Sequence, residues 1–205
     1  MTSKELAAIA HELRYWQWFV QTARFLTGWV QKNPTPELNP FVQGYIKSVN
    51  PTSMLDVGSG VVSILNGLIP GAKLTAADPL GELYGLIFDY KRNGISPPEP
   101  YPAEELPYVD AFDIVHMSNA LDHCQNPELV VQKLYLAAKP GGSVIVQGFV
   151  EEGKAEGYSG FHQWDLDLIN GVIVANGKPI TGQGKITNKI MTPQKREWFI
   201  WIAQK

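Results

Sequence analysis

The chain has 205 residues, of which 44% are hydrophobic and 18% are charged, and these values fit one globular domain of generous size. The formal net charge of -3 argues against a general grip on nucleic acid, and no apolar run reaches the ~18 residues that a membrane span needs. The lone cysteine, Cys124, excludes an internal disulfide and a multi-thiolate zinc site. Residues 1–16 lack a basic-then-apolar signal pattern, so a cytoplasmic soluble protein is expected.

A helix is predicted for about residues 2–31, because Thr2 and Glu5 have capping-box spacing and prolines follow from residue 34 onward. One apolar stripe has helical spacing and consists of Leu6, Ile9, Leu13, Trp16 and Val20. Other aromatic side chains between residues 15 and 19 spread around the helix. We therefore expect it to close over a ligand, to join a subunit interface, or to pack in the core. A second, shorter helix is predicted for residues 41–49.

After residue 51, predicted strands and helices alternate. The predicted strands are residues 53–58, 72–79, 111–120 and 143–150, and the predicted helices are residues 61–69, 80–94 and 127–142. Residues 95–102 are too rich in proline for a central strand. This alternation predicts a parallel sheet covered by helices on both faces.

The C-terminal part breaks this alternation. Residues 164–177 have alternating apolar positions around Asn170-Gly171, which is the strongest short signal for a β-hairpin. A last strand is predicted for residues 196–204. Antiparallel strands are therefore expected near the C-terminus.

The stretch TSMLDVGSGVVSIL, residues 52–65, places Gly58 and Gly60 on either side of Ser59 after a predicted strand. This predicts a sharp turn whose exposed backbone N–H groups meet a ligand that approaches closely. Asp78 ends the next strand, 20 residues after Gly58, which is the spacing of an acid that binds ribose hydroxyls. Asp56 would repel a pyrophosphate and favours a cationic group such as an ammonium or a sulfonium.

Four segments in order resemble the class I S-adenosylmethionine-dependent methyltransferases, specifically their small-molecule "type 11" branch. These segments are LDVGSG (55–60), LTAADP (74–79), AEELPYVDAFDIVHMSNALDH (103–123) and LAAKPGGSVIV (136–146). The resemblance covers about residues 50–150. It implies a Rossmann-like, mostly parallel, doubly wound sheet with antiparallel C-terminal strands, formed by residues 51–205 and preceded by a helical cap of residues 1–50.

The resemblance implies S-adenosylmethionine as the cofactor and methyl transfer to a small molecule as the reaction. The implied cofactor-binding residues are Asp56, Gly58, Ser59, Gly60, Asp78, Pro79, Ala103, Glu104, Asn119 and Ala120. Pro102 stands where the family commonly has an aspartate that binds adenine. Adenine recognition is therefore expected from the Ala103 backbone and Glu104.

Two histidines are candidate catalytic bases, and they make a hydroxyl oxygen the expected acceptor. His162 lies in a glycine-flanked loop, and His123 follows the predicted fourth strand. Their alternatives are structural: an aromatic-anchored loop around His162, and a capping or surface role for His123. The other expected substrate contacts are Tyr15, Trp16, Asp122, Gln163 and Trp164, although Asp122 alternatively caps the next helix. His116 is expected to be a core histidine and His11 to be solvated.

The expected partner is a small-molecule substrate, with no nucleic acid, membrane or metal, and a homodimer is a further possibility. A rival hypothesis is a non-catalytic protein that binds the cofactor or regulates a partner. A nicotinamide oxidoreductase is disfavoured because Ser63 stands at the third glycine position and a Tyr-x-x-x-Lys pair is missing.

Overall fold

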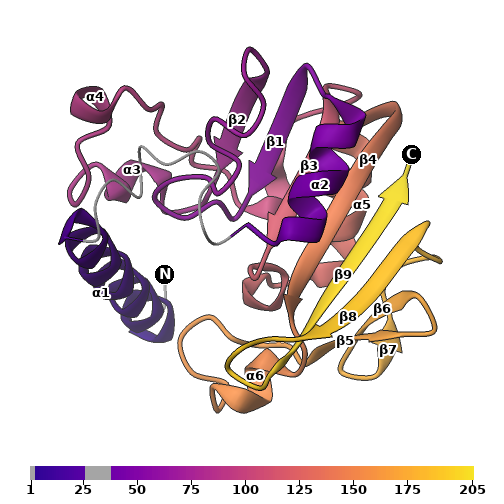
Figure 1. Cartoon of the computed structure of the whole chain (residues 1–205). Coiled ribbons are helices and arrows are strands. Elements are labelled where there is room, and N and C mark those ends of the chain that lie inside the picture. Colours follow the sequence, from indigo (N-terminus) through magenta and orange to yellow (C-terminus); the bar gives the residue numbers. More distant parts are fainter. Residues whose placement is uncertain (1–2, 26–37) are drawn as a thin grey trace.

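The computed structural model describes residues 3–25 and 38–205 (Figure 1). Its main sheet has six strands in the order β2-β1-β3-β4-β9-β8. In that order their bounds are Lys73–Ala77, Ser53–Val57, Phe112–Ser118, Ala138–Phe149, Glu197–Gln204 and Ile186–Met191. The first four strands are parallel, whereas β9 is antiparallel to both β4 and β8. The predicted mostly parallel sheet with antiparallel C-terminal strands is confirmed.

The two faces of this sheet have separate cores because successive strand residues point to opposite sides. Leu55 of β1 and Val115 of β3 belong to the core on the face of α5 (Pro127–Ala137), whereas Met54 and Ile114 belong to the core on the face of α2 (Pro40–Val49). Figure 1 shows α2 in front of the sheet and α5 behind it. Burial on both faces explains why these strands are nearly continuous apolar runs.

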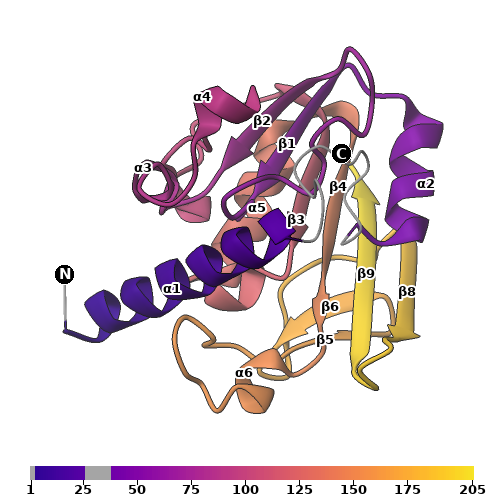
Figure 2. The ribbon, with the colours of Figure 1, turned by 60° about the vertical axis from the view of Figure 1, so that its left-hand side comes forward.

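The helix α1 (Ser3–Phe25) lies beside the carboxyl ends of the parallel strands (Figure 2). Ile9, Leu13, Trp16 and Val20 of its predicted apolar stripe join a cluster with Tyr84 and other residues that follow β2. Thr2 of the predicted capping box and the predicted end near residue 31 lie outside the described residues.

The helix predicted at residues 61–69 is wrong, because these residues form successive turns. The backbone N–H of Asn66 donates to Ser63 O and that of Leu68 donates to Leu65 O, which is turn spacing rather than α-helical spacing. Gly67 has a φ of 66°, which ends any helix there. The connection from β1 to β2 therefore has no helix at the glycine turn.

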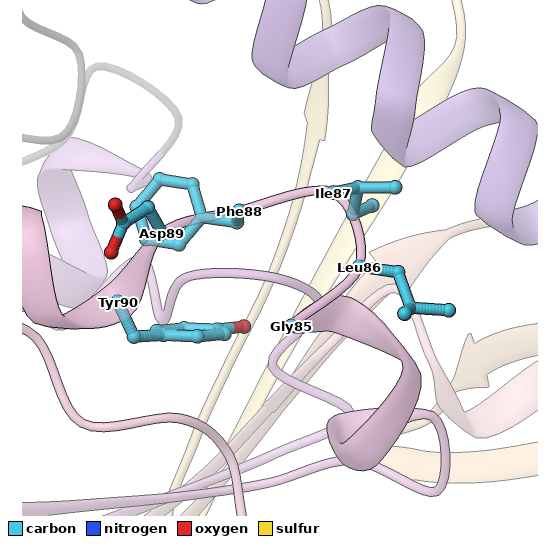
Figure 3. A pocket seen from close by; sticks show the side chains of 6 residues that line it. All are labelled: Gly85, Leu86, Ile87, Phe88, Asp89 and Tyr90. Atoms are coloured by element: carbon cyan, nitrogen blue, oxygen red, sulfur yellow. The ribbon is translucent and has the colours of Figure 1, made fainter.

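The single helix predicted at residues 80–94 is also wrong. Two one-turn helices form instead, α3 (Gly81–Tyr84) and α4 (Tyr90–Asn93), and Gly94 ends α4 in the left-handed conformation as predicted. The segment between these helices and the first residue of α4 line a pocket (Figure 3). The lining residues are Gly85, Leu86, Ile87, Phe88, Asp89 and Tyr90. No predicted site residue lines this pocket.

The helix α5 is confirmed, but it ends at Ala137 rather than near Pro140-Gly141, because β4 begins directly at Ala138. The pairing of β3 with β4 shifts register between Phe112 and Ile114. At this shift Gly142 lies so close to the chain that a Cβ would be 3.0 Å from the Phe112 carbonyl oxygen. The proline-glycine segment is therefore part of an irregular strand and not a loop.

The predicted hairpin forms from β5 (Leu166–Ile169) and β6 (Val172–Ala175), with positive φ at both Asn170 and Gly171. It does not join the main sheet. It pairs instead with β7 (Lys178–Pro179) in a separate three-stranded sheet. The strand β8 and the short helix α6 (Glu152–Ala155) were not predicted.

Within residues 3–25 and 38–205, no helix has both the length and the apolar character needed to cross a membrane.

Candidate functional site

The carboxyl ends of β1 and β3 meet at the glycine turn. Gly58 has a φ of 65°, and a Cβ on it would be 2.4 Å from the Cβ of Ala120. Two independent constraints, the backbone conformation and the close approach, therefore require glycine here. This contact brings the residues after β3, including the predicted Asn119 and Ala120, to the predicted cofactor turn.

The backbone N–H groups of the glycine turn are already hydrogen-bonded. Those of Gly58 and Ser59 donate to the Ala77 carbonyl oxygen at 2.8 and 3.3 Å, and that of Gly60 donates to Asp78 Oδ2 at 3.0 Å. The prediction of free N–H groups is wrong for these three positions. The turn is instead held rigidly against the end of β2.

Asp78 is the acceptor that organises this end of the sheet. Besides Gly60, its carboxylate accepts from Leu80 N at 2.9 Å and from the Tyr84 hydroxyl at 3.1 Å. Burial raises the pKa of Asp78, although its hydrogen bonds oppose this shift. A carboxylate has about four lone-pair positions, so one acceptor position remains at Asp78 for a ligand.

Asp56 is buried and holds one end of a chain of polar contacts across the sheet. Its oxygens contact Ser63 Oγ at 2.6 Å and His116 Nδ1 at 2.7 Å. His116 Nε2 lies 2.9 Å from the amide nitrogen of Gln147, whose Oε1 accepts from Trp198 Nε1 at 3.1 Å. The amide nitrogen is a donor, so His116 Nε2 accepts and Nδ1–H donates to Asp56. His116 is therefore a satisfied core histidine, as expected.

Both Asp56 oxygens are thus engaged inside the protein. This arrangement favours a role in positioning the glycine turn over direct contact with a cationic ligand.

The helix α1 covers the glycine turn with Trp16. If Gly60 had a Cβ, it would lie 2.1 Å from Cζ2 of the Trp16 ring, so the indole rests directly on this glycine. Trp16 Nε1 donates to Glu12 Oε1 at 2.8 Å, and its ring meets that of Tyr84 edge-on at 6.3 Å. Burial raises the pKa of Glu12. Tyr15 is exposed and lies alongside Phe19.

The remaining predicted cofactor residues differ in how available they are. Glu104 Oε1 accepts from the backbone N–H groups of Gln125 and Asn126, at 2.8 and 3.1 Å, next to the start of α5. Ala103 is buried and Pro79 is exposed. The Glu104 carboxylate therefore has a structural task, and its role in adenine recognition stays a prediction.

Asp122, His123 and His162 form one polar group, here called the Asp-His-His cluster. His162 Nδ1 lies 2.6 Å from Asp122 Oδ2 and 3.1 Å from His123 Nε2. Asp122 does not cap α5, because the Asn126 side chain does so by accepting from Leu129 N. The structure thus brings together three residues that were predicted separately.

The loop that carries His162 is tied to the segment after β3 by its own neighbours. Gln163 N donates to Asp122 O at 2.9 Å, Gln163 Nε2 donates to His123 O at 3.1 Å, and Trp164 Nε1 donates to Cys124 O at 2.8 Å. Trp164 also packs against the core on the α5 face. These contacts favour an anchoring role for Gln163 and Trp164, which was the alternative to substrate contact.

The two histidines of the cluster have different electrostatic surroundings. Burial lowers the pKa of His162, but the hydrogen bond with Asp122 and the negative charge of that residue outweigh burial and raise it overall. For His123, burial dominates and lowers the pKa.

The residues that sequence analysis missed at this site are Glu12 and Tyr84. Glu12 lies one helical turn before Trp16, and this spacing was the available signal.

The chain matches the methyltransferase domain family over residues 10–176. It is 30% identical over 117 residues to the tRNA U34 carboxymethyltransferase of Pseudoalteromonas atlantica, a match that covers 55% of this chain and 36% of that protein. The chain thus spans about a third of the length of this curated relative.

Solved structures share the fold at low sequence identity. The 1,6-didemethyltoxoflavin-N1-methyltransferase of Burkholderia thailandensis has a TM-score of 0.57 and 14% identity, covering 100% of this chain and 91% of that one. The N-methyltransferase NodS of Bradyrhizobium japonicum has a TM-score of 0.53 and 10% identity, covering 86% and 94%. The chain therefore belongs to the methyltransferase domain family and has the Rossmann-like fold of the class I enzymes that use S-adenosylmethionine.

Proposed function

We propose that this methyltransferase transfers the methyl group of S-adenosylmethionine to a hydroxyl oxygen of a small molecule. The Asp-His-His cluster is the observation that carries the choice of oxygen. It follows β3 directly, and Ala120, two residues before Asp122, touches the glycine turn. This proximity supports the assignment of a proton acceptor next to the predicted cofactor site.

The bound methyl donor supplies the sulfonium, and the protein supplies position and a proton acceptor. In-line methyl transfer needs the acceptor atom aligned with the S–CH₃ bond, which is a matter of binding geometry. A neutral hydroxyl must also lose its proton as it attacks. When His162 donates its Nδ1–H to Asp122, the lone pair of Nε2 is left to take that proton.

A small molecule is favoured over RNA as the acceptor. The curated relative acts, by its name, on tRNA, but the match covers only 36% of that protein. The formal net charge of -3 does not favour a polyanionic substrate.

The test is a screen of hydroxyl- and amine-bearing small molecules with S-adenosylmethionine labelled in the methyl group. We expect label on oxygen, and exclusive labelling of nitrogen would refute the choice of acceptor. His162→Ala should lower turnover by about 10²- to 10⁴-fold, because general-base assistance is typically of that size. Binding of S-adenosylhomocysteine should stay unchanged. Glu128→Gln is the control, since Glu128 is an exposed carboxylate on α5.

If His123→Ala abolishes turnover while His162→Ala does not, His123 is the base and the roles within the cluster are reversed. If neither substitution matters, the acceptor needs no base and the choice of oxygen is wrong.

A further inference from the structure

The Asp-His-His cluster brings one ligand atom from each of its residues towards a common point. The three pairwise separations are 2.6 Å between Asp122 Oδ2 and His162 Nδ1, 3.1 Å between His162 Nδ1 and His123 Nε2, and 3.7 Å between His123 Nε2 and Asp122 Oδ2. The residues come from two segments about 40 positions apart in the chain.

Hydrogen bonds alone do not satisfy this arrangement. His162 Nδ1 lies within hydrogen-bond distance of two partners, but a ring nitrogen offers either one proton or one lone pair. If its proton goes to Asp122, no lone pair remains for His123. If its lone pair accepts from His123, two acceptors face each other at 2.6 Å. In the absence of a third species, the best arrangement left is one N–H shared between the two partners, which weakens each contact.

The three atoms lie close enough together for one metal ion to contact all of them. A triangle with these sides has a circumscribed radius of about 1.9 Å. A point about 0.8 Å above its plane is therefore about 2.05 Å from all three atoms, which is within the range of Zn–N and Zn–O bonds. A bound cation would accept a lone pair from each atom and remove the conflict over the proton.

The surroundings of the cluster also favour a cation. Glu152 and Glu156 act electrostatically on His162, as does Glu12 from α1. Arg196, which contacts the cluster's neighbour Glu152, is already paired with that carboxylate. Arg196 offsets the charge of Glu152, so Glu12 and Glu156 are the negative neighbours that remain.

We propose that the Asp-His-His cluster binds a divalent transition-metal ion such as Zn²⁺, in place of our expectation from the sequence that there is no metal. Two imidazole nitrogens and one carboxylate suit Zn²⁺ and its neighbours in the first transition series, whereas Mg²⁺ and Ca²⁺ prefer oxygen ligands alone. The His162 side chain is 18% exposed and that of His123 is 24% exposed, so positions on the metal stay reachable. Three protein ligands and an open position are typical of catalytic rather than structural zinc.

The role of the metal rests on the proposed function. A metal held by these three side chains would lower the pKa of a hydroxyl group that it contacts, and the proton of that group would pass to water. The oxygen then forms its bond to the methyl carbon while the S–CH₃ bond breaks, and that electron pair stays on sulfur. The metal thereby takes over the task given above to His162, whose Nδ1 becomes a ligand.

Isothermal titration of the EDTA-treated full chain with ZnCl₂ tests the site. We expect one equivalent to bind, and His123→Ala and Asp122→Asn each to weaken binding by about 100-fold or more, since loss of even an outer partner typically costs 10- to 100-fold. Glu128→Gln, which changes an exposed carboxylate on α5, should bind as the wild type does. Thermal melting of each variant shows that it is folded, and Asp122→Asn keeps the side-chain volume. Co²⁺ in place of Zn²⁺ should give visible absorbance bands that the same variants lose.

The proposal is overturned if the wild type binds no Zn²⁺ at micromolar concentrations, or if the cluster variants bind as tightly as Glu128→Gln. Because the titration contains neither cofactor nor acceptor, it does not depend on methyl transfer. Zinc binding without transfer to oxygen would uphold the site and refute the proposed acceptor. Transfer to oxygen that EDTA leaves intact, with no zinc bound, would refute the site and leave His162 as the base.

Discussion

Replacing Asp78 tests whether the carboxylate that holds the glycine turn also holds the cofactor. In the structure Asp78 accepts hydrogen bonds from Gly60 N, Leu80 N and the Tyr84 hydroxyl, which leaves one acceptor position for a ribose hydroxyl. Charge-assisted hydrogen bonds of this kind contribute about 1.5–3 kcal/mol. Asp78→Asn should therefore raise the Kd for S-adenosylhomocysteine by about 10- to 150-fold, because 1.4 kcal/mol corresponds to a factor of ten.

Isothermal titration of folded protein is the assay, and Tyr84→Phe is the matched control. That control removes one internal donor to Asp78 while keeping its charge, so we expect its Kd to change by less than about threefold. An unchanged Kd for Asp78→Asn would refute the ribose assignment. An equal increase in both variants would show that only the internal bonding of the turn matters.

Three further substitutions test the architecture by urea unfolding. Gly58→Ala should lower the free energy of unfolding by about 2–4 kcal/mol, because it adds a clash with Ala120 to the cost of a left-handed φ. The control is Gly94→Ala, where φ is similar but the space is open, and it should cost only about 1 kcal/mol. Equal losses in the two variants would contradict the clash. Trp16→Ala should cost about 1–2 kcal/mol for a half-buried ring, and no loss would show that α1 is not docked on the turn. Burial raises the pKa of Asp113, but Lys139 and nearby hydroxyl and N–H donors outweigh burial and hold it well below its ordinary range. The ionised Asp113 carboxylate therefore stabilises the fold at any pH above its unfolded pKa of about 3.9, and this contribution is lost as the pH falls through the folded pKa. Asp113→Asn should cost roughly 1–2 kcal/mol at pH ~7 and less in more acidic solution. A cost that does not change with pH would contradict this.

Most strands, though not β7 and β8, were predictable because their signals are local. Apolar and β-branched residues such as those of β3 favour a buried strand, and Asn170-Gly171 has few turn conformations open to it. The failed helix at residues 61–69 has apolar spacing that suits a helix. A contact with Asp56, made by Ser63 from seven positions away, and the left-handed Gly67 decide against it. These are tertiary and backbone effects that spacing does not contain.

The candidate site, like the fold, was predictable only where its signals are local. The position of Asp78 follows from strand order and spacing, so sequence analysis found it. His123 and His162 appeared as rivals because strand order places both segments at the same edge of the sheet but does not show that the two side chains meet. The backbone and side-chain hydrogen bonds of Gln163 and Trp164 create that proximity. The occupied N–H groups of the glycine turn were unpredictable for the same reason, since their acceptors belong to β2 and Asp78.

The contact of the Trp16 ring with Gly60 links the position of α1 to whatever occupies the space beside the turn. A ligand that needs this space binds only the protein molecules in which the Trp16 indole has moved away. The apparent affinity for the ligand is therefore the intrinsic affinity multiplied by the fraction of protein in that open state. Linkage is reciprocal, so the bound ligand must in turn shift the helix population by the same factor. The helix α1 thus competes with the ligand for the same space. Amide hydrogen exchange in α1 would therefore report whether a ligand occupies the site, although that site is formed by another part of the chain.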